Sequence, residues 1–395
     1  MDKALEEKLT NGGRVPLPVG VNLQKLVAAD KIVEGIRKGD GMAVAEFKHH
    51  LGARFSEHLT TGDDFIFAFS QLTALEVDRQ FVEADRTWTD AIDTEVVRSF
   101  DAPKVYSINY DNVTGFERPQ TEAGKPGHVP PIVPESSPYP MFKLGAEEAA
   151  SGSIHKAGGL FSLSFERIVS DAGVLVPQLP GIITDFLLER EEYDAWTGLF
   201  TFIGGTPNHL KAGTNVDGTA VVADAPISRS ALAGALTQAR AGEINGRKVS
   251  VTSYNVLVPV GQADVAQFYI NNYRVTGQTD SDGYDISFNG YNPLSGIAGV
   301  VETEYLTGTQ WAVIPVKGSI RGGSSRRFYN LGRLQGFEGP DVRIENVTGN
   351  YQSGGDVSPF AGSFETDDAR MRGRIICGGL GWNPEYAVIS DGDGV

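Results

Sequence analysis

Residues 158–200 have the sequence GGLFSLSFERIVSDAGVLVPQLPGIITDFLLEREEYDAWTGLF. Within this stretch, the short apolar run Leu160–Phe165 predicts a buried β-strand. Leu179–Phe200 predicts a long amphipathic helix with Pro177 and Pro180 at its start, where missing backbone N–H groups cost least. Its apolar face carries Leu179, Ile182, Ile183, Phe186, Leu187, Tyr193 and Trp196, and the opposite face carries Asp185, Glu189, Glu191, Glu192 and Asp194. A strand that leads into a long helix indicates a mixed α+β fold.

The sequence before this stretch predicts helices and then a long extended excursion. Apolar side chains recur every three or four residues within 23–36, 44–59 and 65–84, and the helices that they predict fit either an extended arm or a small helical domain. Residues 101–140 contain eight prolines, which leave room only for short pieces such as a strand at Val105–Tyr110. The lack of helical pattern from 117 to 140 predicts a loop that contacts something outside its own core.

The sequence after this stretch predicts a separate α/β or α+β domain over residues 206–330. Ser228 is placed to cap a helix. Further predicted elements are strands at Val249–Val251, Asn255–Pro259 and Trp311–Val316 and a helix at Ala263–Asn272. The C-terminal region predicts strands at 342–347 and 370–376, and Gly378-Gly379 predicts a break after the second.

Composition and charge exclude several classes of protein. The 395 residues include 48 glycines without a collagen-like period, which indicates many turns. The formal net charge of −16 repels phosphate backbones, which argues against a dedicated nucleic-acid binder. Cys377 is the single cysteine, so neither an intrachain disulfide nor a multi-thiolate metal site is possible. Met1–Arg14 lacks the apolar core of a signal peptide, and no apolar run approaches a bilayer span, so we expect a soluble cytosolic product without membrane contact.

No motif predicts catalysis, a metal or a cofactor. His49, His50 and His58 lack the i, i+4 pairing of zinc hydrolases, which favours a surface or packing role. Asp280–Asp285 has its glycine at the wrong position for an EF-hand loop. The glycine-rich run 204–215, which includes His209, lacks the lysine of a Walker motif, and a nucleophile elbow is missing from the chain.

The order of these segments resembles that of the major capsid proteins of tailed phages. These coat proteins have the HK-ninety-seven-type fold, which encapsulin nanocompartments share. The resemblance is carried by the strand Gly158–Phe165 with its Ile168-Val169-Ser170-Asp171 turn, the spine helix from Leu179, Pro226-Ile227-Ser228 opening a helix, Val256–Pro259 before a helix from Ala263, and Trp88–Ile92 before the strand Val105–Tyr110. It covers roughly residues 60–390, and the ordered set carries it rather than one specific motif.

The resemblance implies an α+β HK-ninety-seven-type capsid fold with four parts. Residues 1–100 would form the N-terminal arm and 101–165 the extended β-hairpin loop. Residues 166–203 and 331–395 would form the peripheral domain with its spine helix, and 204–330 the axial domain.

The resemblance also implies a self-assembling structural protein that is not an enzyme. Pentamers and hexamers would close into the icosahedral head shell around the double-stranded DNA genome of a tailed phage. The implied partners are further copies, scaffold, portal and decoration proteins, and packaged DNA bound without sequence specificity. We expect assembly in the host bacterial cytoplasm and a final place in the virion capsid.

Five basic residues are candidate inter-subunit contacts: Lys143, Lys156, Arg321, Arg326 and Arg327. The two lysines lie in the implied extended loop. The three arginines flank 322–325, and DNA, an acidic neighbour and solvent are all open as partners, with subunit contact favoured. Residues 1–60 are too short and glycine-broken for a cleaved scaffolding segment. We predict no isopeptide crosslink, because neither its acidic catalyst nor its partner asparagine is identifiable.

Two alternatives stay open. An encapsulin-type shell shares the implied fold, and packaged nucleic acid separates the two. A cytosolic α/β hydrolase or glycan-binding protein is the second alternative, which activity in an unassembled monomer would favour.

Overall fold

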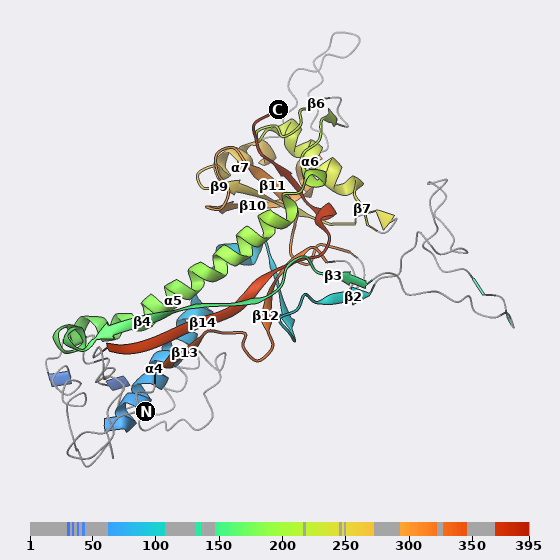
Figure 1. Cartoon of the computed structure of the whole chain (residues 1–395). Helices are drawn as coiled ribbons and strands as arrows, with labels where there is room; N and C mark the ends of the chain where they lie inside the picture. The colour runs from blue at the N-terminus through green and yellow to red at the C-terminus, as the bar shows by residue number, and fades with distance from the viewer. Residues whose placement is uncertain are drawn as a thin grey trace, which may run out of the picture. The chain divides into compact units, whose positions relative to one another are not determined.

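The computed structural model describes residues 62–106, 147–215, 219–244, 247–248, 250–271, 293–321, 327–345 and 368–394, with isolated positions between 30 and 43 and between 132 and 137. The chain mixes helices and sheets (Figure 1), as predicted. It divides into two compact units. Unit 1 comprises Met1–Asp85, His155–Glu191 and Leu334–Cys377, and unit 2 comprises Arg86–Ile154, Glu192–Arg333 and Gly378–Val395.

Unit 1 is built around the long strand β14, Asp368–Gly381, of which it contains the residues up to Cys377. All of strand β4, His155–Ser164, pairs antiparallel with one edge of β14. Strand β13, Asp341–Ile344, pairs antiparallel with the other edge, and helix α4, Gly62–Glu83, contacts β13. Helix α5 lies along β4 and β14 (Figure 1), where the Phe186 ring meets Phe161 edge-on at 5.3 Å.

Helix α5 is longer than the sequence predicts. It spans Phe165–Ile203, 39 residues, and begins directly after β4 without the predicted turn at 168–171. The predicted start near Leu179 is therefore wrong, and Pro177 and Pro180 lie inside the helix. Two of the five acidic residues predicted on the exposed face, Glu191 and Asp194, are buried.

The predicted strand Leu160–Phe165 is confirmed up to Ser164 as part of β4, whereas Phe165 already begins α5; its prediction as a buried strand is wrong. Exposure alternates along β4, so that Leu163 is buried while Leu160 is 72% exposed. The predicted break at Gly378-Gly379 is also wrong, because β14 continues through both glycines to Gly381. A Cβ atom at either glycine would collide with Ser153 or Tyr329, so close approach explains them better than chain termination does.

Unit 2 contains a four-stranded sheet in the order β10-β9-β11-β15. Strand β9, Tyr254–Pro259, pairs parallel with β10, Ile297–Thr303, and antiparallel with β11, Trp311–Pro315. Strand β15, Val388–Ser390, completes it antiparallel to β11. Helix α6, Arg229–Ala241, contacts β11 and β15, and helix α7, Ala263–Asn271, contacts β9 and β10. The buried core between these layers includes Leu232, Leu236, Val256, Trp311 and Val388.

Several predictions for unit 2 are confirmed. The Ser228 hydroxyl accepts a hydrogen bond from the Ala231 N–H at 3.2 Å and caps α6. The predicted helix at 263 and the strands at 255 and 311 correspond to α7, β9 and β11. Val251 forms only an isolated bridge to Ile320, so no strand is present at that residue.

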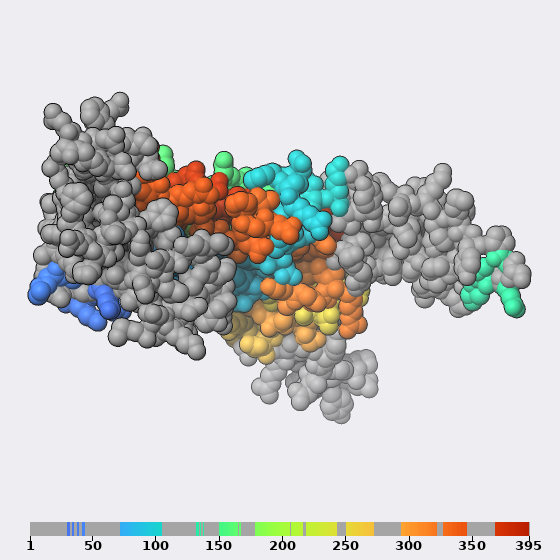
Figure 2. All heavy atoms as spheres, turned by 90° about the horizontal axis from the view of Figure 1, so that it is seen from below, coloured from blue at the N-terminus to red at the C-terminus, as the bar shows by residue number. Residues whose placement is uncertain are grey.

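The remaining described elements are short. They are η1 Thr87–Asp90, β1 Asp93–Val97, β2 Lys104–Tyr106, β3 Glu147–Ala149, η3 Thr206–Asn208, β5 Gly213–Thr214, β6 Ala220–Val221, β7 Glu243–Ile244, β8 Arg247–Lys248, η4 Pro293–Gly296, β12 Tyr329–Leu334 and η6 Pro384–Tyr386. The segment with β1 and β2 is seen in cyan at the surface in Figure 2, and Val96 within it is 52% exposed. None of the described helices is long and apolar enough to span a membrane.

The N-terminal and loop predictions are tested only in part. Helix α4 confirms the helix predicted over 65–84, and β2 confirms the first two residues of the strand predicted at Val105–Tyr110, the rest of which lies outside the described residues. The helices predicted within 23–36 and 44–59 lie outside the described residues apart from isolated positions. The excursion predicted over 117–140 also falls almost wholly outside them.

Candidate functional site

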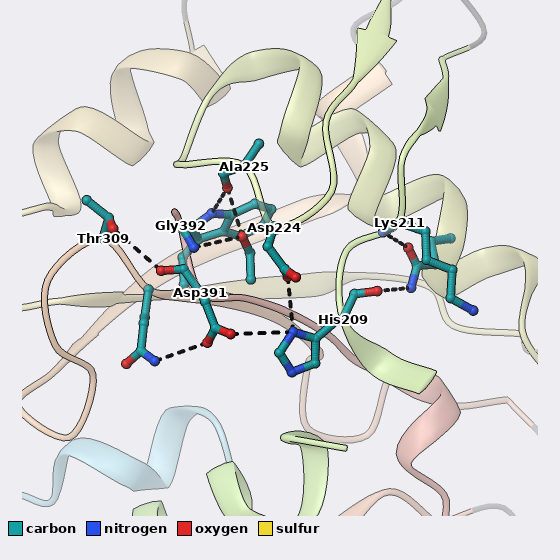
Figure 3. A network of polar contacts seen from close by, with 11 residues as sticks. His209, Lys211, Asp224, Ala225, Thr309, Asp391 and Gly392 are labelled. Carbon is teal, nitrogen blue, oxygen red and sulfur yellow. Dashed lines mark hydrogen bonds and ion pairs between the residues drawn. The ribbon is translucent and has the colours of Figure 1, made fainter. Parts of the chain in front are cut away.

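Three side chains of unit 2, of residue types that can bind metals, come together at one point (Figure 3). The Nδ1 atom of His209 lies 3.1 Å from Oδ1 of Asp224 and 3.6 Å from Oδ2 of Asp391. His209 follows η3, Asp224 lies between β6 and α6, and Asp391 follows β15. We call these three residues the His–Asp cluster. Their side chains are 23%, 23% and 43% exposed, so the cluster is half-buried and open to small solutes.

Backbone hydrogen bonds hold the three segments of the cluster in place. The Leu210 N–H donates to the Ile389 carbonyl at 2.8 Å, which joins the segment of His209 to β15. The Asp224 N–H donates to the Leu210 carbonyl at 3.1 Å, and the Asp224 carbonyl accepts from the Gly394 N–H at 2.8 Å. Asp224 has φ +44°, a left-handed conformation that aspartate tolerates better than most residues.

Buried side chains fix the floor of the cluster. The Ala225 carbonyl accepts hydrogen bonds from Trp311 Nε1 at 3.0 Å and from the Ser390 hydroxyl at 2.8 Å. The second oxygen of Asp391, Oδ1, accepts from Gln310 Nε2 at 3.2 Å. The sheet and the C-terminal segment therefore orient the carboxylates before any ligand arrives.

Helix α6 supports the histidine from the other side. Gln238 on α6 donates from Nε2 to the His209 carbonyl at 2.8 Å, and its Oε1 accepts the Lys211 N–H at 2.9 Å (Figure 3). The backbone on both sides of Leu210 is thus tied to one side chain. These bonds fix the backbone that carries the imidazole.

Sequence patterns did not predict the His–Asp cluster. His209 belongs to the glycine-rich run 204–215, and it stands 15 residues from Asp224 and far from Asp391 along the chain. Only the strand pairing that places β15 beside residue 209 brings Asp391 close, through the bridge between His209 and Ile389. No local motif signals such a contact.

The predicted contact residues are spread over both units. Lys156 lies on β4 in unit 1 and is exposed. Arg321 in unit 2 is exposed, and its N–H donates to the Ser250 carbonyl at 2.9 Å. Arg327 is half-buried in unit 2, where it pairs with Glu95 and lies 5.4 Å over the Trp382 ring. Lys143 and Arg326 lie outside the described residues.

Arg327 also lines a pocket of about 240 Å³ in unit 2. Asp93, Lys317, Tyr329 and Asn330 contribute the other polar side chains of its wall. Lys317 pairs with Asp93 at 3.2 Å, and Glu95 accepts from Asn330 Nδ2 at 3.0 Å as well as pairing with Arg327. The charges in this wall are therefore largely matched within the chain.

Comparison with known proteins decides the family. The sequence model of a family described as phage capsid protein matches residues 147–390, more than half of the chain. The chain belongs to the phage capsid protein family. The resemblance predicted from the order of its segments is confirmed at this level. The chain is thus a structural protein of the capsid shell, and its place is the virion capsid.

Solved structures resemble this capsid protein more distantly. The virus-like particle from Pyrococcus furiosus shares 10% identity over 80% of this chain and 97% of its own, with a TM-score of 0.40. Mycobacterium phage Patience shares 14% identity over 89% and 91%, with a TM-score of 0.40. The capsid of an empty GTA particle shares 12% identity over 78% and 90%, with a TM-score of 0.39. Among curated proteins no sequence match is found, so the family assignment rests on the family model.

Proposed function

We propose that this capsid protein is the major capsid protein of a tailed phage. It assembles as pentamers and hexamers into the icosahedral head shell that encloses a double-stranded DNA genome. The match of the phage capsid family to residues 147–390 carries the proposal, because that range includes β4, α5, the sheet of unit 2 and the whole of β14. Assembly takes place in the host bacterial cytoplasm, with scaffold, portal and decoration proteins as further partners.

Exposed apolar side chains support a role in repeated subunit contacts. Leu160 and Ile182 of unit 1 are 72% and 47% exposed, and Phe268 of unit 2 is 60% exposed. Large apolar groups at a surface favour burial against a partner, and each buried Leu, Ile or Phe is worth about 1.5–3 kcal/mol. Several modest contacts per subunit multiply into a stable shell. The net charge of −16 fits a container that holds DNA without binding its sequence.

The division into parts remains a proposal. Residues 1–100 serve as the N-terminal arm, 101–165 as the extended loop, 166–203 and 331–395 as the peripheral domain, and 204–330 as the axial domain. In this arrangement Lys143 and Lys156 contact neighbours from the extended loop. Arg321 and Arg326 contact acidic groups of the next subunit, and Arg327, held by Glu95, shapes the adjoining surface.

Electron microscopy tests the proposal directly. The full-length chain is expressed alone and with its neighbouring genes, then separated by size-exclusion chromatography and viewed by negative stain. Closed shells, or rings of five and six subunits, are the expected result. Nucleic acid inside native particles distinguishes a phage head from an encapsulin-type shell. A monomer under both conditions contradicts the proposal and directs attention to enzymatic activity.

A further inference from the structure

The donor atoms of the His–Asp cluster have the spacing of ligands around one metal ion. Zinc ligands lie about 2.0–2.2 Å from the ion, so two ligands of a tetrahedral site lie roughly 3.3–3.6 Å apart. In the cluster, Nδ1 of His209 lies 3.1 Å and 3.6 Å from the two carboxylate oxygens, close to that spacing. Each of the three residues offers a ligand atom that lies within 4.8 Å of those of the other two. We propose that His209, Asp224 and Asp391 bind a divalent transition-metal ion, with Zn²⁺ as the best match.

Hydrogen bonding alone satisfies this arrangement less well. Nδ1 of an imidazole carries at most one proton, which it donates to one acceptor. Asp224 at 3.1 Å is within hydrogen-bond range, whereas Asp391 at 3.6 Å is beyond it. A metal ion at the centre of the cluster accepts an electron pair from each of the three atoms and leaves none of them without a partner.

The charge of the cluster also favours a cation. Two carboxylates bring two negative charges, and His209 contributes at most one positive charge. Among the described residues, no lysine or arginine forms an ion pair with Asp224 or Asp391, whose partners are His209, Gln310 and backbone groups. A divalent cation balances this charge, whereas a protonated histidine leaves one negative charge over.

The three ligands are held before the metal binds, which lowers the cost of binding. Backbone hydrogen bonds at Leu210 and Asp224 position two of the side chains, and Gln310 orients the third. Three protein ligands with partial exposure leave a coordination position open to water. One imidazole and two carboxylates suit Zn²⁺ first, with Mn²⁺ and Ni²⁺ as weaker candidates. The bound ion joins the segment after η3, the β6–α6 connection and the C-terminal segment.

Metal binding by the full-length chain tests the proposal. The protein is stripped with a chelator, and Zn²⁺ is added while the melting temperature and the bound zinc per chain are measured. The matched variants are Asp224→Asn and Asp391→Asn, which remove one charge each and keep the side-chain size. Asn also tolerates the left-handed backbone at 224. The control is Asp185→Asn, an exposed carboxylate on α5.

The expected result is one more zinc per chain in the wild type and the control than in either cluster variant. Zinc raises the melting temperature of the wild type by about 3 °C or more, and this rise is lost in both cluster variants. His49, His50, His58, His128 and His155 stay in every variant, so zinc bound elsewhere cancels in the comparison. Equal zinc content in wild type and variants, or no rise in the wild type, overturns the proposal. The two variants act at separate segments, so poor folding of one leaves the other as the test.

Discussion

At the scale of single residues, Asp78 is the side chain whose ionisation costs the fold most clearly. It lies on α4 in unit 1, where burial and the nearby Asp341 carboxylate raise its pKa to about 7. Partial burial opposes ionisation of Asp341, but hydrogen bonds and charges of Arg343 and Arg374 hold its pKa below the usual value. Asp341 therefore keeps its charge, and Asp78 takes up the proton.

The pH dependence of stability follows from this raised pKa. The folded chain keeps the Asp78 proton up to about pH 7, whereas the unfolded chain loses it near pH 4. The unfolded state then binds fewer protons, so the free energy of unfolding falls as pH rises between those values. We expect Asp78→Asn to match the wild type at pH 4 and to exceed it by about 1–3 kcal/mol at pH 8. Denaturant unfolding at both pH values measures this difference, and parallel profiles for the two proteins would contradict it.

At the scale of elements, the sequence predicted those whose signal is local. Ser228 starts α6 as predicted, because a side-chain cap depends only on the neighbouring residues. Pro177 and Pro180 lie inside α5 although proline prefers the first turn of a helix, so these two prolines do not mark where this helix begins. The predicted break at Gly379 is wrong because the glycine is required by a residue that lies far away along the chain. The Tyr329 hydroxyl occupies the space above it and donates to the Ala195 carbonyl at 3.1 Å.

The cap of α6 supplies a prediction at the same scale. Ser228→Ala leaves the Ala231 N–H without its acceptor, and Ser228→Thr keeps it. We expect the alanine variant to lose about 1 kcal/mol of unfolding free energy and the threonine variant to lose only a few tenths. Thermal or denaturant unfolding of the full-length chain measures both. Equal losses in the two variants would show that packing rather than the cap sets the stability of this end.

At the scale of the whole molecule, the family fixes the role of the chain in the capsid shell. The His–Asp cluster could not be predicted from sequence, because three separate segments form it only after the sheet of unit 2 has paired. Residues that contact other subunits are equally hard to predict from sequence. Apolar residues at helical spacing usually lie in the core of a protein, so the pattern alone does not show which of them are exposed. Val265 and Phe268 of α7 lie three residues apart on one face, yet they are 44% and 60% exposed.

This exposed face of α7 yields the prediction that bears on assembly. Phe268→Ser removes a ring that touches Tyr269 at 5.7 Å and otherwise faces solvent, so the unfolding free energy of the isolated chain changes by less than about 1 kcal/mol. If copies of the chain bury this face in the shell, the loss of an aromatic contact recurs in every subunit. We expect the yield of closed shells to fall at least several-fold, counted by electron microscopy at matched protein concentration. Gln267→Ser is the control, because Gln267 is the exposed neighbour on the same helix and carries no ring. Shell yields that stay equal across the wild type and both variants would exclude this face of α7 from the subunit contacts, even where shells form as proposed.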